Sequence, residues 1–176
     1  KYNLSVSEEE KIYEKLLSME AKRITKHIEP YAIQVAAMFG VLTRLEEPKK
    51  MTLAQKMKLY DGQSVEGFKE QDIKEVRKDT QREGLHGISP RSMVNIISET
   101  LIDEEIPSLN PFAILSNIHT SLQLSRFPKV SVEDKERYLD IIDIVRKEFT
   151  DIAKNEVLKA FLASYEQAME ALCANY

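Results

Sequence analysis

The chain has 176 residues, of which 43% are hydrophobic and 31% are charged, and its formal net charge is −4 at pH 7. This composition predicts a helix-rich globular protein and argues against a nucleic-acid partner. The single cysteine excludes an internal disulfide framework and favours a reducing, cytoplasmic location. No apolar run approaches the roughly 18 residues of a membrane span, so no membrane partner is expected. The start without Met and the end inside a helical pattern favour a fragment of a longer protein.

The first predicted helix runs from about Ser7 to Met19. Ser7 is the predicted N-cap, because its hydroxyl can accept a hydrogen bond from a free amide of the first turn. Ile12, Leu16 and Met19 share one face of this helix. We therefore expect this face to pack inward.

A second helix is predicted over residues 32–45, beginning after Pro30. Almost every residue up to Leu42 is apolar, so the helix should be buried on most sides. Arg44, near its end, is expected to bond the last carbonyls of the helix. His27 has no second ligand at metal-binding spacing and is expected to be a cap or a surface residue.

Thr52 and Gln55 have the spacing of a capping box for a short helix that ends near Leu59. A solvated basic face is favoured over a phosphate-facing patch for the lysines around it, which are Lys49, Lys50, Lys56 and Lys58. Residues 64–83 are dense in both charges and predict an exposed helix with ion pairs between residues i and i+4. Its thin apolar stripe consists of Ile73, Val76 and Thr80.

The segment Gly84–Arg91 predicts a helix end, a tight loop and the start of a new helix. Its glycines suit left-handed backbone positions, while Ser89 suits an N-cap and Pro90 the first helical position. An inward-facing stripe is predicted for Met93, Ile96, Ile97, Thr100 and Leu101. Arg91 falls on the opposite face, in the first turn, where the helix dipole disfavours a cation. This position raises the question of which anion Arg91 meets.

Asn110 and Pro111 predict the start of a helix that runs to about Leu124. Its predicted inner side consists of Phe112, Leu115, Ile118 and Leu122. Ser131 caps a last helical pattern, whose apolar line is Leu139, Ile142, Val145, Phe149 and Ile152 and resumes at Val157, Phe161, Ala168 and Leu172. The line slips near Asn155, so a bend or a turn between two helices is expected there.

Catalytic motifs are missing from the sequence. It has no phosphate loop of the G-x-x-x-x-G-K-[S/T] type, no H-R-D or D-F-G kinase motif, and no C-x-x-C or H-E-x-x-H pair. No carboxylate has neighbours that mark it as a general acid or base. Local chemistry therefore predicts an all-α protein in which Arg91 is an exposed cation of interest.

The segment Gly87-Ile88-Ser89-Pro90-Arg91 resembles the second-sensor motif of AAA+ ATPases, in the Gly-x-Ser-Pro-Arg form of MoxR-like members. In that superfamily the motif opens a helix of the small helical lid, and its arginine reaches the γ-phosphate held by the large domain. The residue type suits this role, because a guanidinium is always charged and can donate two parallel hydrogen bonds to a phosphate.

Six segments, in order along most of the chain, resemble the PrkA family of bacterial serine protein kinases. They are His27–Pro30, Val35–Leu45, Lys56–Gly62, Glu83–Arg91, Glu136–Leu139 and Ala153–Phe161. The resemblance implies a parent with an N-terminal AAA+ ATPase region and a distantly kinase-like C-terminal domain. We expect residues 1–104 to form an AAA+ lid-like helical bundle, and residues 105–176 to form a helical linker, a long C-terminal helix and the start of the C-terminal domain.

The resemblance assigns a functional role to Arg91 only. Arg91 would contact ATP, which the missing large domain would bind together with Mg; no catalytic residue and no metal ligand is carried over. The fragment itself is expected to bind no cofactor and to be inactive. A protein substrate is implied for the parent, and a homo-oligomer is left open. The alternatives are a helical interaction module of an AAA+ remodelling or proteolytic machine and, for Arg91, a purely structural pair with Glu99 or Glu104.

Overall fold

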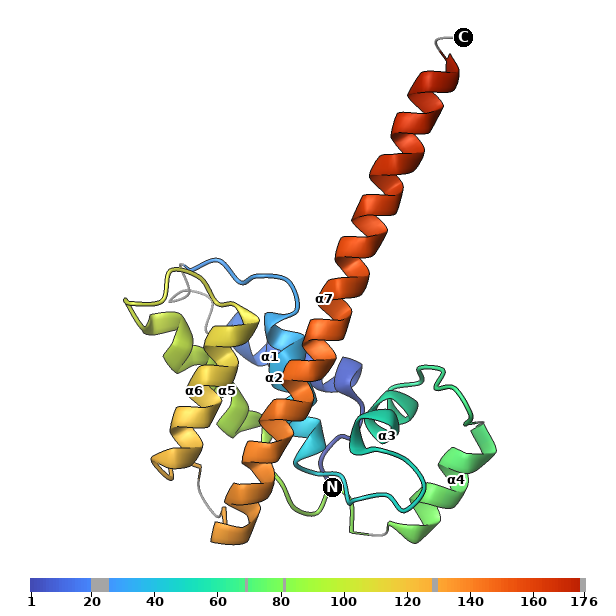
Figure 1. Cartoon of the computed structure of the whole chain (residues 1–176). Coiled ribbons are helices and arrows are strands. Elements are labelled where there is room, and N and C mark those ends of the chain that lie inside the picture. The colour runs from blue at the N-terminus through green and yellow to red at the C-terminus, as the bar shows by residue number, and fades with distance from the viewer. Residues whose placement is uncertain (20–25, 69, 81, 128–129, 175–176) are drawn as a thin grey trace.

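The computed structural model describes residues 1–19, 26–68, 70–80, 82–127 and 130–174. Within these ranges the chain forms seven helices and no strand, which confirms the predicted all-α fold class (Figure 1). The helices are α1 (Val6–Met19), α2 (Ala32–Leu42), α3 (Leu53–Tyr60), α4 (Glu70–Asp79), α5 (Pro90–Ile102), α6 (Pro111–Gln123) and α7 (Val132–Ala174). None of these helices is both long and apolar enough to cross a membrane.

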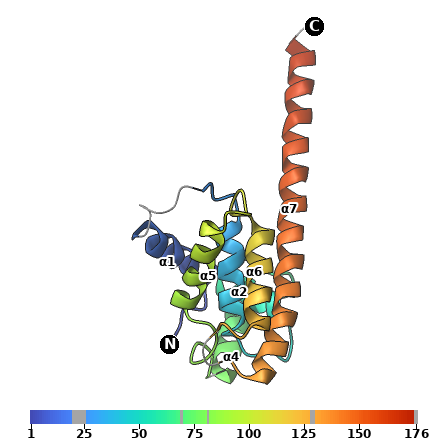
Figure 2. The same ribbon diagram turned by 90° about the vertical axis from the view of Figure 1, so that its left-hand side faces the viewer.

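α2 is the centre of the fold. Its sequence is apolar on every side, and all of its residues except Gln34 are buried, as predicted. α1, α3, α5, α6 and α7 all pack against it. Figure 2 shows α2 between α5 and α6, with α1 beyond α5 and α7 beyond α6. The predicted parts 1–104 and 105–176 therefore share one hydrophobic core, and their division stays a prediction about the domains of the parent.

α1 buries a different face from the predicted one. Its core-facing side chains are Val6, Glu9, Tyr13 and Leu17. Ile12 and Met19, predicted to face inward, are exposed, and Leu16 is only partly buried. The prediction followed apolar residues alone and so missed Glu9, whose charge is satisfied inside the protein by Arg44.

Ser5, rather than the predicted Ser7, caps α1. The Glu8 N–H donates to Ser5 Oγ at 3.3 Å. The Ser5 hydroxyl and the Ser7 N–H each donate to Asp61 Oδ1 at 2.8 Å. Asp61 follows α3, so these hydrogen bonds fix the start of α1 to the end of α3.

The Asp61 carboxylate makes this junction sensitive to acid. Burial opposes its ionisation, but hydrogen bonds from Ser7 and Ser5 outweigh burial and lower the pKa of Asp61 below its ordinary 3.8. A pKa lowered by folding stabilises the protein above the unfolded-state pKa, and this contribution is lost as the pH falls through the folded-state pKa.

We therefore expect the stability difference between wild type and Asp61→Asn to be constant above about pH 5 and to shrink below it, most steeply under pH 3.8. Urea unfolding of both proteins over this pH range measures the difference directly. Carboxylates that Asp61 does not affect titrate alike in both proteins, so their contributions cancel; Glu10, whose pKa the Asp61 charge raises, is the exception. A difference that is independent of pH would contradict the assignment.

The local sequence predicts the start of α3 correctly but not the bounds of α4. The predicted capping box is present: the Gln55 N–H donates to Thr52 Oγ1 at 3.2 Å, and the Thr52 N–H donates to Gln55 Oε1 at 2.9 Å. α4, in contrast, is shorter than the predicted 64–83. Gly67 has a φ of 83°, which is incompatible with a right-handed helix and delays its start.

The predicted basic face around α3 is wrong in part. The Lys56 side chain is fully buried in an ion pair with Glu83, and Lys58 pairs with Glu148 of α7 at 2.5 Å. Lys49 and Lys50 are exposed as predicted, and Lys58 is partly exposed. Two of the four lysines therefore connect elements of the fold.

α6 begins at Pro111 with Asn110 as N-cap, as predicted. Its buried side includes Leu115, Ile118 and Leu122, but the prediction for Phe112 is wrong, because 60% of its surface is exposed. Phe112 instead makes an edge-to-face contact with Phe149 of α7, with ring centroids 5.5 Å apart.

α7 is a single helix of 43 residues, so the bend or turn predicted near Asn155 is wrong. Its first half buries Tyr138, Ile141, Ile142 and Val145. Its second half leaves the body of the protein (Figure 1) and exposes Val157, Leu158, Phe161, Leu162 and Tyr165. At about 100° per residue, this second apolar face is turned by roughly half a turn from the first. The slip in the pattern therefore marks a change of face, while the predicted side chains at 168 and 172 lie outside those described.

Candidate functional site around Arg91

α5 begins where the sequence predicts. Ser89 is its N-cap, and Ser89 Oγ accepts a hydrogen bond from the Ser92 N–H at 3.1 Å. Pro90 occupies the first helical position. The predicted stripe is buried throughout, at Met93, Ile96, Ile97, Thr100 and Leu101. Packing and capping together give the first turn of α5 a fixed position on the core.

Arg91 lies in this first turn and is exposed, as predicted. It takes part in none of the ion pairs found in the described part of the chain. Glu99, one of its two suggested structural partners, pairs with Arg126 at 3.4 Å, and Glu104 forms no ion pair with it. The guanidinium is thus available to an anion from outside the described chain.

The loop before α5 is bonded to the end of α2. The Ile88 N–H donates to Thr43 Oγ1 at 3.0 Å, and Arg44 Nε donates to the Ile88 carbonyl at 3.0 Å. The Gly84 N–H donates to the Arg44 carbonyl at 3.2 Å. Both backbone groups of Ile88, the residue before the N-cap, are therefore held by the two residues that follow α2.

Arg44 is the buried connector of this region. Its Nη2 atom lies 2.5 Å from Glu9 Oε1, and both side chains are fully buried. Its Nη1 atom donates to the Asn3 carbonyl at 3.0 Å. The prediction that Arg44 bonds the last carbonyls of its own helix is wrong, because its guanidinium binds α1, the N-terminal segment and the loop instead.

Glycine is required where the loop approaches α2. Gly84 and Gly87 have φ of 75° and 104°, a conformation that side chains disfavour. A Cβ on Gly87 would lie 2.7 Å from Arg44 Cγ and 2.8 Å from the Thr43 carbonyl oxygen. The loop can therefore pass this close to α2 only without a side chain at position 87.

A cavity of about 680 Å³ lies beside the loop. Its wall carries the guanidinium groups of Arg82 and Arg137 together with the carboxylates of Glu46 and Asp134, and the aromatic rings of Tyr2 and Tyr138 also line it. Burial raises the pKa of Tyr138 to about 12, so this phenol stays neutral. Arg91 is not among the lining residues, so the cavity and the exposed guanidinium are separate features of the loop.

A second buried carboxylate lies next to the loop, at Glu83. Its two oxygens accept four hydrogen bonds, from the Glu46 N–H, Lys56 Nζ, the Tyr60 hydroxyl and the Thr80 hydroxyl. Burial, reinforced by this carboxylate, raises the pKa of Tyr60 to about 12, so the phenol remains a donor. Glu83 thus joins α3, the end of α4 and the loop after α2.

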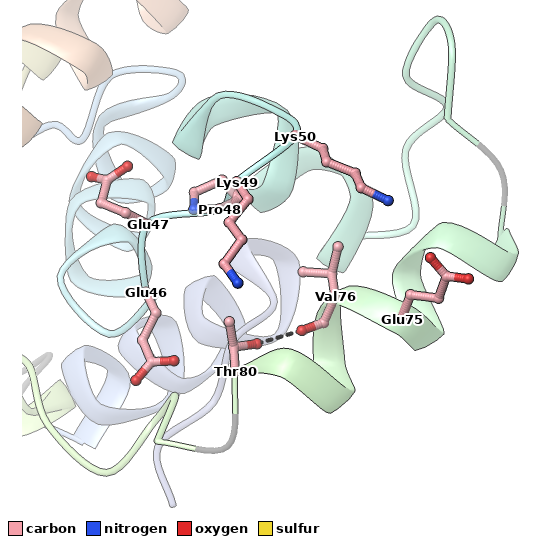
Figure 3. A pocket seen from close by; sticks show the side chains of 8 residues that line it. All are labelled: Glu46, Glu47, Pro48, Lys49, Lys50, Glu75, Val76 and Thr80. Carbon is pink, nitrogen blue, oxygen red and sulfur yellow. Dashed lines mark hydrogen bonds between the residues drawn. The ribbon is translucent and has the colours of Figure 1, made fainter.

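The surface cavity above this network measures about 370 Å³. Figure 3 shows Lys49 and Lys50 at this cavity, together with the carboxylates of Glu46, Glu47 and Glu75. Three carboxylates beside two ammonium groups leave no excess of positive charge. The geometry therefore gives no support to the phosphate-facing alternative for these lysines.

The chain matches two family models, described as the PrkA AAA domain over residues 1–52 and the PrkA serine protein kinase C-terminal domain over residues 54–176. It is 47% identical over 177 residues to the "ATP-dependent protease PrkA" of Bacillus subtilis, covering 99% of this chain and 28% of that protein. It is 29% identical over 174 residues to the "Serine/threonine kinase YeaG" of Escherichia coli K12, covering 94% of this chain and 26% of that protein. No solved structure matches the chain.

Arg91 lies in the part matched by the C-terminal model, and α2 in the part matched by the AAA model. The boundary between the models falls just before α3, yet α2 packs directly against α5, α6 and α7. The sequence boundary at residues 52–54 therefore does not separate two cores.

Proposed function

Because the chain belongs to the PrkA family, we propose that it is the nucleotide-sensing helical part of a longer, ATP-dependent protein kinase. The observation that carries the proposal is the exposed, unpaired guanidinium of Arg91. It lies in the first turn of α5, a helix that is capped by Ser89 and packs its other face into the core. In this role Arg91 would donate to the γ-phosphate of ATP bound by the preceding large domain. The chain spans about a quarter of its curated relatives, so the kinase activity belongs to the parent.

The path of the N-terminal segment supports this role. The Tyr2 N–H donates to the Gly84 carbonyl at 2.7 Å, so the chain enters beside the loop that leads to Arg91. A domain joined to this segment would start next to the same loop. No long linker is then needed to bring a bound phosphate near Arg91.

The electrostatics of the helix start also favour an anion. The positive end of the α5 dipole lies at its first turn, together with the charge of Arg91. A phosphate would meet both, whereas the cation alone is disfavoured there. In this proposal Mg is bound together with ATP by the large domain.

The test is ATP hydrolysis by the full-length parent carrying Arg91→Ala. Loss of a charge-assisted hydrogen bond of about 1.5–3 kcal/mol predicts a roughly ten- to hundred-fold drop in kcat/KM for ATP. Thermal stability should change little, because the side chain leaves no cavity. Arg126→Ala is a matched control, since it removes an exposed arginine of the same region that pairs with Glu99. Unchanged hydrolysis with a lowered Tm would show a structural role instead.

A second candidate is an ATP-dependent proteolytic machine, which the name of the Bacillus subtilis relative favours. Both candidates need the same ATP sensor, so Arg91→Ala does not separate them. Parallel assays of the intact parent with labelled ATP and an unfolded protein substrate do. The kinase proposal predicts label on the protein without cleavage, and ATP-dependent cleavage without label would replace it.

A further inference from the structure

The two residues that follow α2 bind the loop just before Arg91. Thr43 and Arg44 bind both backbone groups of Ile88, at 3.0 Å each. Only Ser89 and Pro90 separate Ile88 from Arg91. The side chain of Ile88 is also buried, with 3% of its surface exposed, so this anchor cannot shift without disturbing the core.

The Arg44 guanidinium also binds the N-terminal segment before α1. Arg44 Nη1 donates to the Asn3 carbonyl, and Arg44 Nη2 donates to Glu9 of α1. The Arg44 guanidinium also lies over the ring of Tyr2, 5.1 Å from its centroid. One buried side chain therefore contacts the N-terminal segment, α1 and the Arg91 loop at once.

We propose that Arg44 is a positioning residue: it fixes the start of α5, and so Arg91, relative to the segment that leads to the preceding domain. Lysine cannot replace it, because a single ammonium group lacks the planar set of donors that reaches three acceptors in different directions. A shift of the N-terminal segment would act on the Ile88 carbonyl through the same guanidinium. This inference rests on the proposed function of Arg91.

The first experiment uses the 176-residue chain without nucleotide. Thr43→Val removes the acceptor of the Ile88 N–H but keeps the Arg44–Glu9 pair, and Thr43→Ser retains a hydroxyl as the matched control. Hydrogen exchange should become faster in Thr43→Val and Arg44→Lys at residues 84–93, while α6 keeps its protection. Unchanged exchange at residues 84–93 in both variants would overturn the proposal.

The second experiment measures ATP kinetics of the full-length parent. Misplacing a contact by about 1 Å can cost 100-fold, so we expect kcat/KM to fall between about 10- and 100-fold in Arg44→Lys and Thr43→Val. Thr43→Ser should remain close to wild type. In an Arg91→Ala background, Arg44→Lys should cause no further loss, because the residue acts through Arg91.

The outcomes separate this inference from the proposed function. Wild-type kinetics in Arg44→Lys beside impaired Arg91→Ala would overturn the inference alone. Losses that multiply in the double variant would also overturn it, because a general structural defect adds to the loss of Arg91. Wild-type kinetics in Arg91→Ala would overturn the proposed function and the inference together. If Arg44→Lys fails to fold, Thr43→Val replaces it. Thr43→Val is then measured alone and combined with Arg91→Ala, and the same outcomes support or overturn the inference.

Discussion

Glu9→Gln is expected to lower the free energy of unfolding by about 3–5 kcal/mol, since it leaves the buried guanidinium of Arg44 without its counter-ion. Both side chains are fully buried, so water cannot replace the lost charge. Typical domains are stable by about 5–15 kcal/mol, so the variant would retain only part of its stability. Urea unfolding followed by circular dichroism measures the loss.

Glu8→Gln is the matched control on the same helix. Glu8 pairs with Lys11 at 2.7 Å, but both side chains are largely exposed. Loss of such a surface pair costs about 0.2–1 kcal/mol. Equal losses of unfolding free energy in the two variants would mean that burial of the Glu9–Arg44 pair does not increase its contribution to stability.

Glu83→Gln is the second change with a large expected effect. It removes the counter-ion of Lys56, whose side chain is fully buried, and weakens the acceptor for Tyr60 and Thr80. We again expect a loss of about 3–5 kcal/mol in the free energy of unfolding, because one charge of a buried pair is left alone. Denaturant unfolding of the variant provides the value.

A double variant tests whether the pair is the cause. In Glu83→Gln combined with Lys56→Met no buried charge remains, so the double variant should lose less than the sum of the two single losses. Glu75→Gln, an exposed carboxylate on α4, should change stability by less than about 0.5 kcal/mol. Strict additivity of the two single losses would show that Lys56 and Glu83 do not act as a pair.

Local sequence predicted the helix starts where one side chain caps the first turn, although it missed the cap of α1 and the start of α4. Thr52, Ser89, Asn110 and Ser131 were each expected to cap a helix, and each side chain accepts a hydrogen bond from the backbone N–H three residues ahead. A cap depends on residues within one turn, so the information lies in a few neighbouring positions. The expectation about Arg91 rested on the same kind of pattern, and its exposure was predicted correctly.

Buried charges were missed because their partners are far away in sequence. Glu9 lies 35 positions from Arg44, and Lys56 lies 27 positions from Glu83. A signal was present for Glu9, since it falls at helical spacing between Val6 and Tyr13, which both face the core. A charged residue at an inward position predicts a buried partner, but the sequence does not say which one.

The change of face along α7 was also not predictable from the pattern. The phase slip near Asn155 is compatible with a turn, a bend or a straight helix that offers its two halves to different surroundings. The structure distinguishes these three possibilities, because its helical backbone continues without interruption to Ala174.

This continuity has a mechanical consequence. Tyr138, Ile141, Ile142 and Val145 are packed into the core at the near end, whereas the turns after residue 156 continue as helix away from the body. At about 1.5 Å per residue, the eighteen residues from Val157 to Ala174 extend about 27 Å. A tilt of only about 10° at the packed end would then carry the far end through roughly 5 Å. The length of α7 would therefore convert a small change of its angle against the core into a much larger displacement of its distal turns.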